Sequence, residues 1–125
     1  MNLLEKVTLL EGEADQFGFR WETTDQIMEQ IISECKEVSE HLNVPGNYSK
    51  TLLQEEIGDL LHAVFSLCVF CQFSPAETLE KTLLKFDRRL QSVKQLAAER
   101  GLENLVGHSF DELMSFWKQA KINVG

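Results

Sequence analysis

The sequence predicts an all-α fold, an antiparallel bundle of four main helices with a short fifth helix at the C-terminus. Apolar residues recur at three- and four-residue steps along almost the whole chain, and no strand-like alternation extends beyond a few residues. The chain also contains no internal repeat, no low-complexity run and no linker long enough to separate domains. Residues 1–125 are therefore predicted to form a single domain.

The first two helices are predicted from their apolar stripes and from the residues at their ends. The first helix ends near Gly18, a residue type suited to a helix C-cap, and its stripe is Leu3, Val7, Leu10, Ala14 and Phe17. Thr23 or Thr24 can cap the second helix, whose stripe is Ile27, Ile31, Cys35, Val38 and Leu42. Residues 43–49 follow as a loop, because Pro45 and Gly46 interrupt the helical pattern.

Three more helices follow this loop. The third runs from about Lys50 to Gln72, with an apolar stripe made of Leu53, Ile57, Leu60 or Leu61, Val64, Cys68 and Cys71. The fourth begins at Ser74-Pro75-Ala76-Glu77, which combines a capping box with a proline at the first helical position, and it stops at Gly101. A second capping box, Ser109-Phe110-Asp111-Glu112, opens the short last helix.

Residues 63–73 are predicted to lie in a dimer interface. The third helix has a polar side in its N-terminal half, whereas from Ala63 onward only Ser66 and Gln72 are polar. A helix that is apolar all round must be covered all round, and a chain of this length has few helices to cover it. The alternative is that this segment is the central helix of a monomer.

Composition restricts which kinds of partner the protein is expected to bind and where in the cell it is expected to lie. A net charge of −8 argues against binding nucleic acid through a broad basic face. Residues 1–14 lack the basic start of a secretory signal, and the most apolar stretch, residues 60–73, is shorter than the ~20 residues that span a bilayer. Three cysteines cannot all pair with one another. We therefore expect no membrane span and a reduced, cytoplasmic location.

Two pairs of acidic residues form the candidate reactive site. Each pair has a three-residue spacing, which places both carboxylates on one face of a helix; the pairs are Glu34 with Glu37 and Glu56 with Asp59. The short loop makes the second and third helices antiparallel neighbours. With a rise of ~1.5 Å per residue, the two pairs lie level across the interface. Four carboxylates are thus expected to face one small volume.

The physical environment decides what such a cluster means. Two like charges 4 Å apart repel by ~1 kcal/mol in water and by ~4 kcal/mol at an effective dielectric constant of 20. On an open surface the cluster is harmless, and acidic pairs on solvated helices are common. If it is partly enclosed, it needs a counter-charge, and an all-oxygen ligand set suits Mg²⁺ or Mn²⁺.

A basic row on the fourth helix adds to the metal interpretation. Lys81, Lys85 and Arg89 follow one another at four-residue steps, and Trp117 and Lys121 share a face of the last helix in the same way. Cations on one side and fixed positive side chains on the other would hold a polyphosphate. The alternative is that Lys81 and Lys85 only pair with nearby exposed acids.

Together these motifs resemble the MazG-type all-α nucleotide pyrophosphohydrolases. The resemblance rests on the two acidic pairs separated by 18 residues and on three later stretches, Lys85-Phe-Asp-Arg-Arg-Leu, Ala98-Glu-Arg-Gly-Leu and Met114-x-x-x-Trp-Lys, which look like the C-terminal domain of two-domain MazG proteins. It covers about residues 10–121. Two positions depart from the family pattern: Ser33 stands where a second Glu is frequent, and Leu52 where a Lys is frequent.

The resemblance implies an activity and roles for the site residues. It implies Mg²⁺-dependent hydrolysis of nucleoside triphosphates (NTP or dNTP) to the monophosphate and pyrophosphate, by homodimers or homotetramers. The four acids, Glu34, Glu37, Glu56 and Asp59, would bind the metal and carry catalysis, with Glu34 or Glu37 as general base. Lys85, Arg89 and Lys121 would hold the phosphates, and Trp117 would lie near the nucleotide. The alternative function, favoured by Ser33 and Leu52, is a weak or silent helical module that binds nucleotide or a protein partner.

Other residues suggest sites that the sequence supports less well. Cys68 and Cys71 lie on an apolar stripe, which predicts buried reduced thiols. His62 follows Asp59 by three residues, but only one approximate copy of a di-iron motif is present. His41 and His108 lie at helix ends or in loops and are expected to be solvated. Trp21 fits core packing or an interface better than it fits a nucleobase site.

Overall fold

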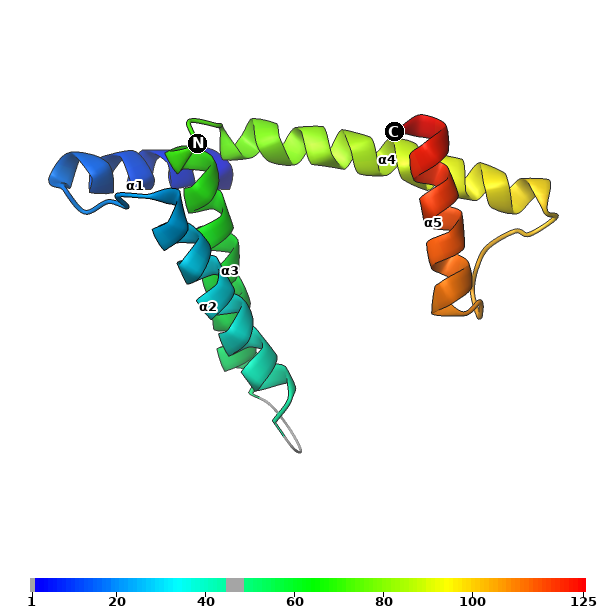
Figure 1. Ribbon diagram of the computed structural model, residues 1–125, viewed down its shortest axis with the longest axis horizontal. Coiled ribbons are helices and arrows are strands. Elements are labelled where there is room, and N and C mark those ends of the chain that lie inside the picture. The colour runs from blue at the N-terminus through cyan, green and yellow to red at the C-terminus, as the bar shows by residue number, and fades with distance from the viewer. Residues whose placement is uncertain (1, 45–48) are drawn as a thin grey trace. The chain divides into compact units, whose positions relative to one another are not determined.

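The computed structural model describes residues 2–44 and 49–125, and every regular element in these ranges is an α-helix (Figure 1). The five helices are α1 (Leu3–Phe17), α2 (Thr24–Leu42), α3 (Lys50–Phe70), α4 (Pro75–Glu99) and α5 (Phe110–Val124). The all-α prediction is confirmed. The last helix is longer than predicted, since α5 has 15 residues, as many as α1.

The helices begin and end at the residues expected from capping chemistry. The Thr23 side chain accepts a hydrogen bond from the Gln26 backbone N–H, and Ser109 accepts one from Glu112 in the same way. Gly18 has a φ of 95° at the end of α1. The third helix ends two residues before the predicted Gln72, because Gln72 itself adopts a left-handed φ of 66°, which no α-helix accommodates. The predicted loop residues 45–48 lie outside the described residues.

The chain divides into two compact units, and each is described by itself. The N-terminal unit ends at Thr78 and contains α1, α2 and α3, and the C-terminal unit spans Leu79–Gly125. The first turn of α4 belongs to the N-terminal unit and the rest of that helix to the C-terminal unit. That residues 1–125 act as a single domain stays a prediction.

In the N-terminal unit α2 and α3 lie side by side in opposite directions, and α1 packs against α3 (Figure 1). The face that α2 buries is rotated from the predicted stripe: Ile27 is fully buried, but Cys35 and Leu42 are exposed. Glu34 is buried as well, and Ile31, Val38 and His41 are half-buried. The packed face of α2 therefore carries polar groups into the helix pair.

One carboxylate of α1 contacts two side chains of α3. The Glu11 carboxylate contacts His62 Nε2 at 2.8 Å and accepts a hydrogen bond from the buried Ser66 hydroxyl. No residue of α1 is itself buried. The packing of α1 thus combines these polar contacts with the half-buried apolar residues Leu4, Val7 and Ala14.

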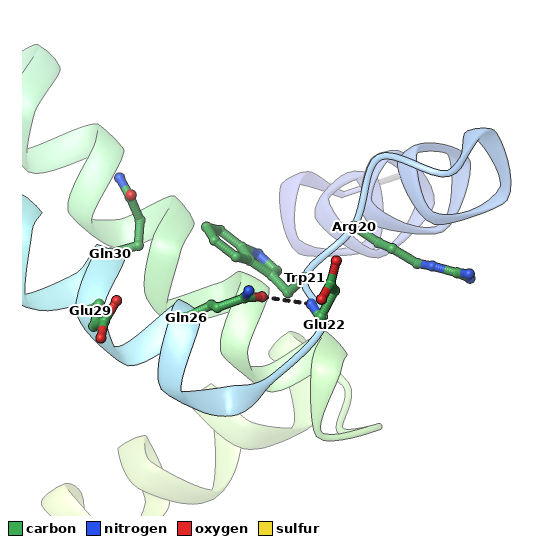
Figure 2. A pocket seen from close by; sticks show the side chains of 6 residues that line it. All are labelled: Arg20, Trp21, Glu22, Gln26, Glu29 and Gln30. Atoms are coloured by element: carbon green, nitrogen blue, oxygen red, sulfur yellow. Dashed lines mark hydrogen bonds between the residues drawn. The ribbon is translucent and has the colours of Figure 1, made fainter.

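Trp21 lies in the link between α1 and α2. Its side chain is half-buried, and the indole lies against the N-terminal part of α2 beside Gln26 and Gln30 (Figure 2). This link therefore brings an aromatic ring close to the polar side of α2.

In the C-terminal unit, the part of α4 from Leu79 onward packs against α5. Phe116 and Ala120 of α5 and Ser92 and Ala97 of α4 are buried. The Arg100 guanidinium lies 4.6 Å from the centroid of the Phe116 ring. The Phe86 ring of α4 also lies 5.7 Å from the Trp117 ring of α5.

Several apolar side chains of α3 are uncovered in the single chain. Ile57, Leu61 and Val64 are 42%, 54% and 41% exposed. Within the predicted interface segment, Phe70 and Phe73 are exposed too. A second copy of the chain would cover such a surface, and the dimer stays a prediction.

None of the helices in the described ranges is by itself long and apolar enough to cross a membrane. Only α3 and α4 taken together are, and the chain bends by 108° between them. All three cysteines are free thiols. The prediction that Cys68 and Cys71 are both buried is wrong for the single chain, because Cys71 is exposed at the end of α3 and Cys68 is half-buried.

Candidate functional site

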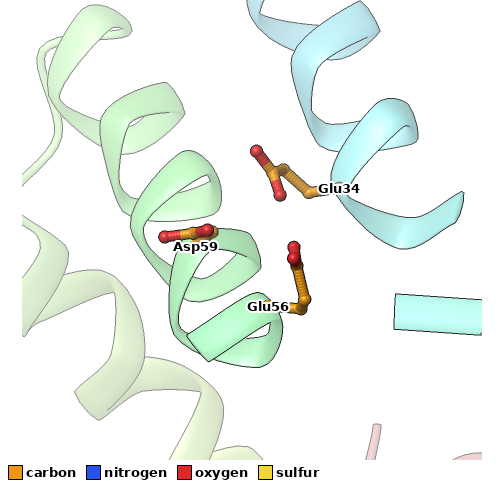
Figure 3. Close-up of side chains that lie close together, drawn as sticks. All are labelled: Glu34, Glu56 and Asp59. Carbon is orange, nitrogen blue, oxygen red and sulfur yellow. The ribbon is translucent and has the colours of Figure 1, made fainter. Parts of the chain in front are cut away.

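Three of the four predicted carboxylates converge between α2 and α3. One oxygen from each of Glu34, Glu56 and Asp59 lies within 4.8 Å of the others. Figure 3 shows Glu34 projecting from α2 toward Glu56, with Asp59 further along α3. The arrangement follows from the antiparallel packing of two helices, because residues three apart on α3 present their side chains to the same point of α2.

The convergence takes place in a partly desolvated setting. Glu34 is only 9% exposed, and the Glu56 side chain is 22% exposed. In the described part of the chain, Glu34 Oε2 and Glu56 Oε2 are buried without a hydrogen-bond partner. Leaving a buried polar atom unpaired costs ~1–3 kcal/mol, and more when it is charged. Burying these two unpaired carboxylate oxygens close together therefore costs folding free energy.

A neutral amide and an imidazole contact these carboxylates. Gln30 Nε2 donates a hydrogen bond of 2.6 Å to Glu34 Oε1. His41 Nε2 lies 3.6 Å from Glu56 Oε1. Among the described residues, no Lys or Arg forms an ion pair with Glu34, Glu56 or Asp59. The negative charge of the cluster is thus not balanced by a fixed cation.

Glu37 occupies a different position from the other three acids. It is exposed and lies outside the group whose oxygens share one point. The Glu56 carboxyl raises the pKa of Glu37, first through a hydrogen bond between the two groups and then through charge repulsion. Of the four carboxylates expected to face one volume, three thus converge within 4.8 Å and Glu37 stands beside Glu56.

Gln30 and His41 were missed as site residues by the sequence interpretation. His41 was expected to be solvated, but its side chain is only 29% exposed and faces Glu56. Spacing could have indicated both residues, because Gln30 precedes Glu34 by four positions and His41 follows Glu37 by four, which places each on the same helix face as an acid of the site. His62, by contrast, contacts Glu11 and is not part of the carboxylate group, which argues against the di-iron alternative.

The predicted phosphate-binding residues all belong to the C-terminal unit. The Arg89 guanidinium lies 5.6 Å from the Trp117 ring centroid, and its Nε donates a hydrogen bond of 2.8 Å to the Gly125 carbonyl. Lys85 and Lys121 are exposed. None of the ion pairs among the described residues involves Lys81 or Lys85, so the alternative in which they pair with nearby acids finds no support. That these residues bind phosphates stays a prediction.

Comparison with known proteins gives one family. The model of the MazG nucleotide pyrophosphohydrolase domain matches residues 22–94, more than half of the chain and a range that includes all four candidate acids. A nucleoside triphosphate pyrophosphohydrolase/pyrophosphatase MazG of Thermotoga maritima is 32% identical over 114 residues, which are 90% of this chain and 41% of that protein. A nucleoside triphosphate pyrophosphohydrolase of Escherichia coli K12 is 31% identical over 104 residues, 83% of this chain and 39% of that protein.

The chain therefore spans about two fifths of the length of these relatives. The matched region includes the helix pair that carries the converging carboxylates. On the strength of that match, the chain belongs to the MazG nucleotide pyrophosphohydrolase domain family.

Proposed function

We propose that this chain is a Mg²⁺-dependent nucleoside triphosphate pyrophosphohydrolase, which converts an NTP or dNTP and water to the monophosphate and pyrophosphate. The observation that carries the proposal is the convergence of Glu34, Glu56 and Asp59 with two buried oxygens that lack a partner among the described residues. The names of the two relatives are consistent with it.

The donor set fits a hard divalent cation. It consists of carboxylate oxygens alone, which suits Mg²⁺ or Mn²⁺ better than Zn²⁺. Glu34, Glu56 and Asp59 would hold the ion, and the Gln30 amide fixes the orientation of the Glu34 carboxylate. When bound, such an ion polarises phosphoryl oxygens and lowers the pKa of coordinated water.

Glu37 is our candidate for the general base. It lies one turn after Glu34 on α2, beside Glu56 but outside the converging group, so its carboxylate is left to accept a proton from the attacking water. In the C-terminal unit, Lys85, Arg89 and Lys121 would neutralise the phosphates, with Trp117 near the nucleotide. The contact between Arg89 and Trp117 supports this part, since it combines a cation with an aromatic face.

We extend the proposal to assembly and location. A homodimer or homotetramer would cover the exposed apolar side of α3, which includes Leu61, Val64 and Phe70. A cytoplasmic location agrees with three free thiols. Neither nucleic acid nor membrane is among the partners we propose.

The test is a pyrophosphate-release assay on canonical and modified NTPs and dNTPs with Mg²⁺. The Glu56→Gln variant should lose at least ~100-fold of the turnover, whereas Glu55→Gln, its exposed neighbour on α3, should keep it. Mg²⁺ binding measured by calorimetry accompanies the assay. Intact Mg²⁺ binding without pyrophosphate from any substrate would favour the silent nucleotide-binding or partner-binding module instead.

A further inference from the structure

A second hollow lies on the N-terminal unit, at the start of α2. Its volume is about 470 Å³, within the range of small-molecule sites. Six residues line it, and we name it the Trp21 hollow (Figure 2): Arg20, Trp21, Glu22, Gln26, Glu29 and Gln30. It differs from the depression beside Glu56, which is lined by Glu37, Glu40, His41, Val44 and Glu56.

Hydrogen bonds determine which side-chain amide groups of Gln26 and Gln30 remain free to bind a ligand. The Gln26 carbonyl accepts from the Glu22 backbone N–H at 2.8 Å and from that of Thr23 at 3.3 Å. Its amide N–H₂ therefore remains as a donor. Gln30 uses its N–H₂ on Glu34, so its carbonyl remains as an acceptor. In the described residues neither remaining group has a protein partner, and the hollow thus offers one donor and one acceptor beside an indole.

The charges of the hollow favour a neutral ring over a phosphate. Glu22 and Glu29 contribute two carboxylates, whereas the single guanidinium, Arg20, lies 3.6 Å from the Asp15 carboxylate outside the hollow. A phosphate would meet net negative charge here. An exocyclic amino group, by contrast, can donate to the Gln30 carbonyl or to a glutamate, since carboxylates accept from the amino groups of bases.

The hollow lies within reach of the converging carboxylates. Gln30 links the two directly, because the same side chain lines the hollow and bonds Glu34. At ~1.5 Å per residue, Gln26 lies roughly 12 Å along α2 from Glu34. A nucleoside unit extends over a comparable length, so phosphates at the carboxylates leave the base near Trp21.

We propose that the Trp21 hollow binds the base of the nucleotide by stacking on the Trp21 indole, and that it favours bases with an exocyclic amino group. The inference rests on the proposed function, whose substrate it specifies. It gives Trp21 a role in addition to the packing or interface role that the sequence predicts. Trp117 is less suited to the role, because Phe86 and Arg89 already lie 5.7 and 5.6 Å from its ring centroid.

Fluorescence with single-tryptophan proteins tests the binding directly. Trp117→Phe leaves Trp21 as the only indole, and Trp21→Phe leaves only Trp117. Cytidine, adenosine and uridine are titrated without metal. Cytidine and adenosine should quench the Trp21-only protein at concentrations several-fold below uridine. They lack the phosphates that Arg89, beside Trp117, is proposed to hold, so they should leave the Trp117-only protein unchanged. Absence of quenching in the Trp21-only protein, or equal quenching by all three nucleosides, would overturn the proposal.

Kinetics separates this inference from the proposed function. Trp21→Ala should raise KM for the triphosphate by on the order of 10-fold, with kcat nearly constant, as expected for a lost stacking contact. Phe19→Ala removes an aromatic side chain that is 81% exposed outside the hollow, and KM should not change. An active Trp21→Ala enzyme with unchanged KM refutes the base site alone. A wild-type chain that binds cytidine but releases no pyrophosphate refutes the hydrolase alone.

Discussion

Replacing Glu56 by Gln should stabilise the metal-free protein while abolishing its response to Mg²⁺. The substitution keeps the shape of the side chain and removes one negative charge from the converging group. At 4.8 Å, two unit charges repel by about 0.9 kcal/mol in water and about 3.5 kcal/mol at an effective dielectric constant of 20. Glu56 has two such neighbours, Glu34 and Asp59.

Together the two neighbours repel Glu56 by about 1.7 kcal/mol in water and about 7 kcal/mol at an effective dielectric constant of 20, and the expected gain lies near the lower of these values. The Glu56 side chain is still 22% exposed, so water screens part of the repulsion. We therefore expect the free energy of unfolding in EDTA to rise by about 2 kcal/mol, which corresponds to about 8 °C in Tm for a chain of this size. With Mg²⁺ at about 10 Kd, the wild type should gain about 1.4 kcal/mol and the variant nothing.

Urea denaturation at pH 8, in EDTA and in Mg²⁺, measures both effects. Glu55→Gln is the matched control, because it removes the same charge from the same turn of α3 on an exposed position. It should change the unfolding free energy by less than ~0.5 kcal/mol in either buffer. If Glu56→Gln instead destabilises the protein in EDTA, the carboxylate has a structural role and the reasoning from charge repulsion fails.

Three further outcomes follow from other parts of the molecule. Phe70→Asp should shift the sedimenting species toward monomer or aggregate, because it places a charge in the predicted interface; an unchanged native mass would remove that interface. Glu11→Ala should cost about 1–3 kcal/mol in urea denaturation, since it leaves the buried Ser66 hydroxyl without its acceptor; an equal effect of Glu13→Ala, an exposed neighbour, would contradict this. Hydrogen bonds from His108 and then from Ser109 lower the pKa of the Glu112 carboxyl below its ordinary 4.5. The ionised carboxylate therefore stabilises the fold above pH 4.5. This contribution is lost as the pH falls through the lower pKa that Glu112 has in the folded protein. The stability difference between wild type and Glu112→Gln should therefore shrink between pH about 6 and about 3, and a constant difference would refute the assignment.

Local sequence signals were sufficient to predict the elements of this fold. Periodicity and capping residues such as Thr23, Ser74 and Ser109 act over a few positions, so they can be interpreted without knowledge of the partners of a helix. The end of α3 was missed by two residues, because nothing in the sequence around Gln72 signals a left-handed residue that is not glycine.

The candidate site was only partly predictable for a related reason. Spacing placed Glu34, Glu56 and Asp59 on facing surfaces, but the rotation of α2 that buries Glu34 and turns Glu37 outward depends on packing with α3. The same rotation brings His41 toward Glu56 and leaves Cys35 exposed. The contact of Glu11 with His62 and Ser66 joins residues more than fifty positions apart, which no local pattern signals.

The converging carboxylates lie on two uninterrupted helices, and this limits which insertions and deletions the gene can tolerate. A single codon inserted between Glu34 and Glu37 would turn one residue away from the other by ~100° and shift it by ~1.5 Å. Substitutions on the outer sides of α2 and α3 leave that geometry intact. Length variation within these two segments should therefore be far rarer among functional descendants than replacement of individual side chains.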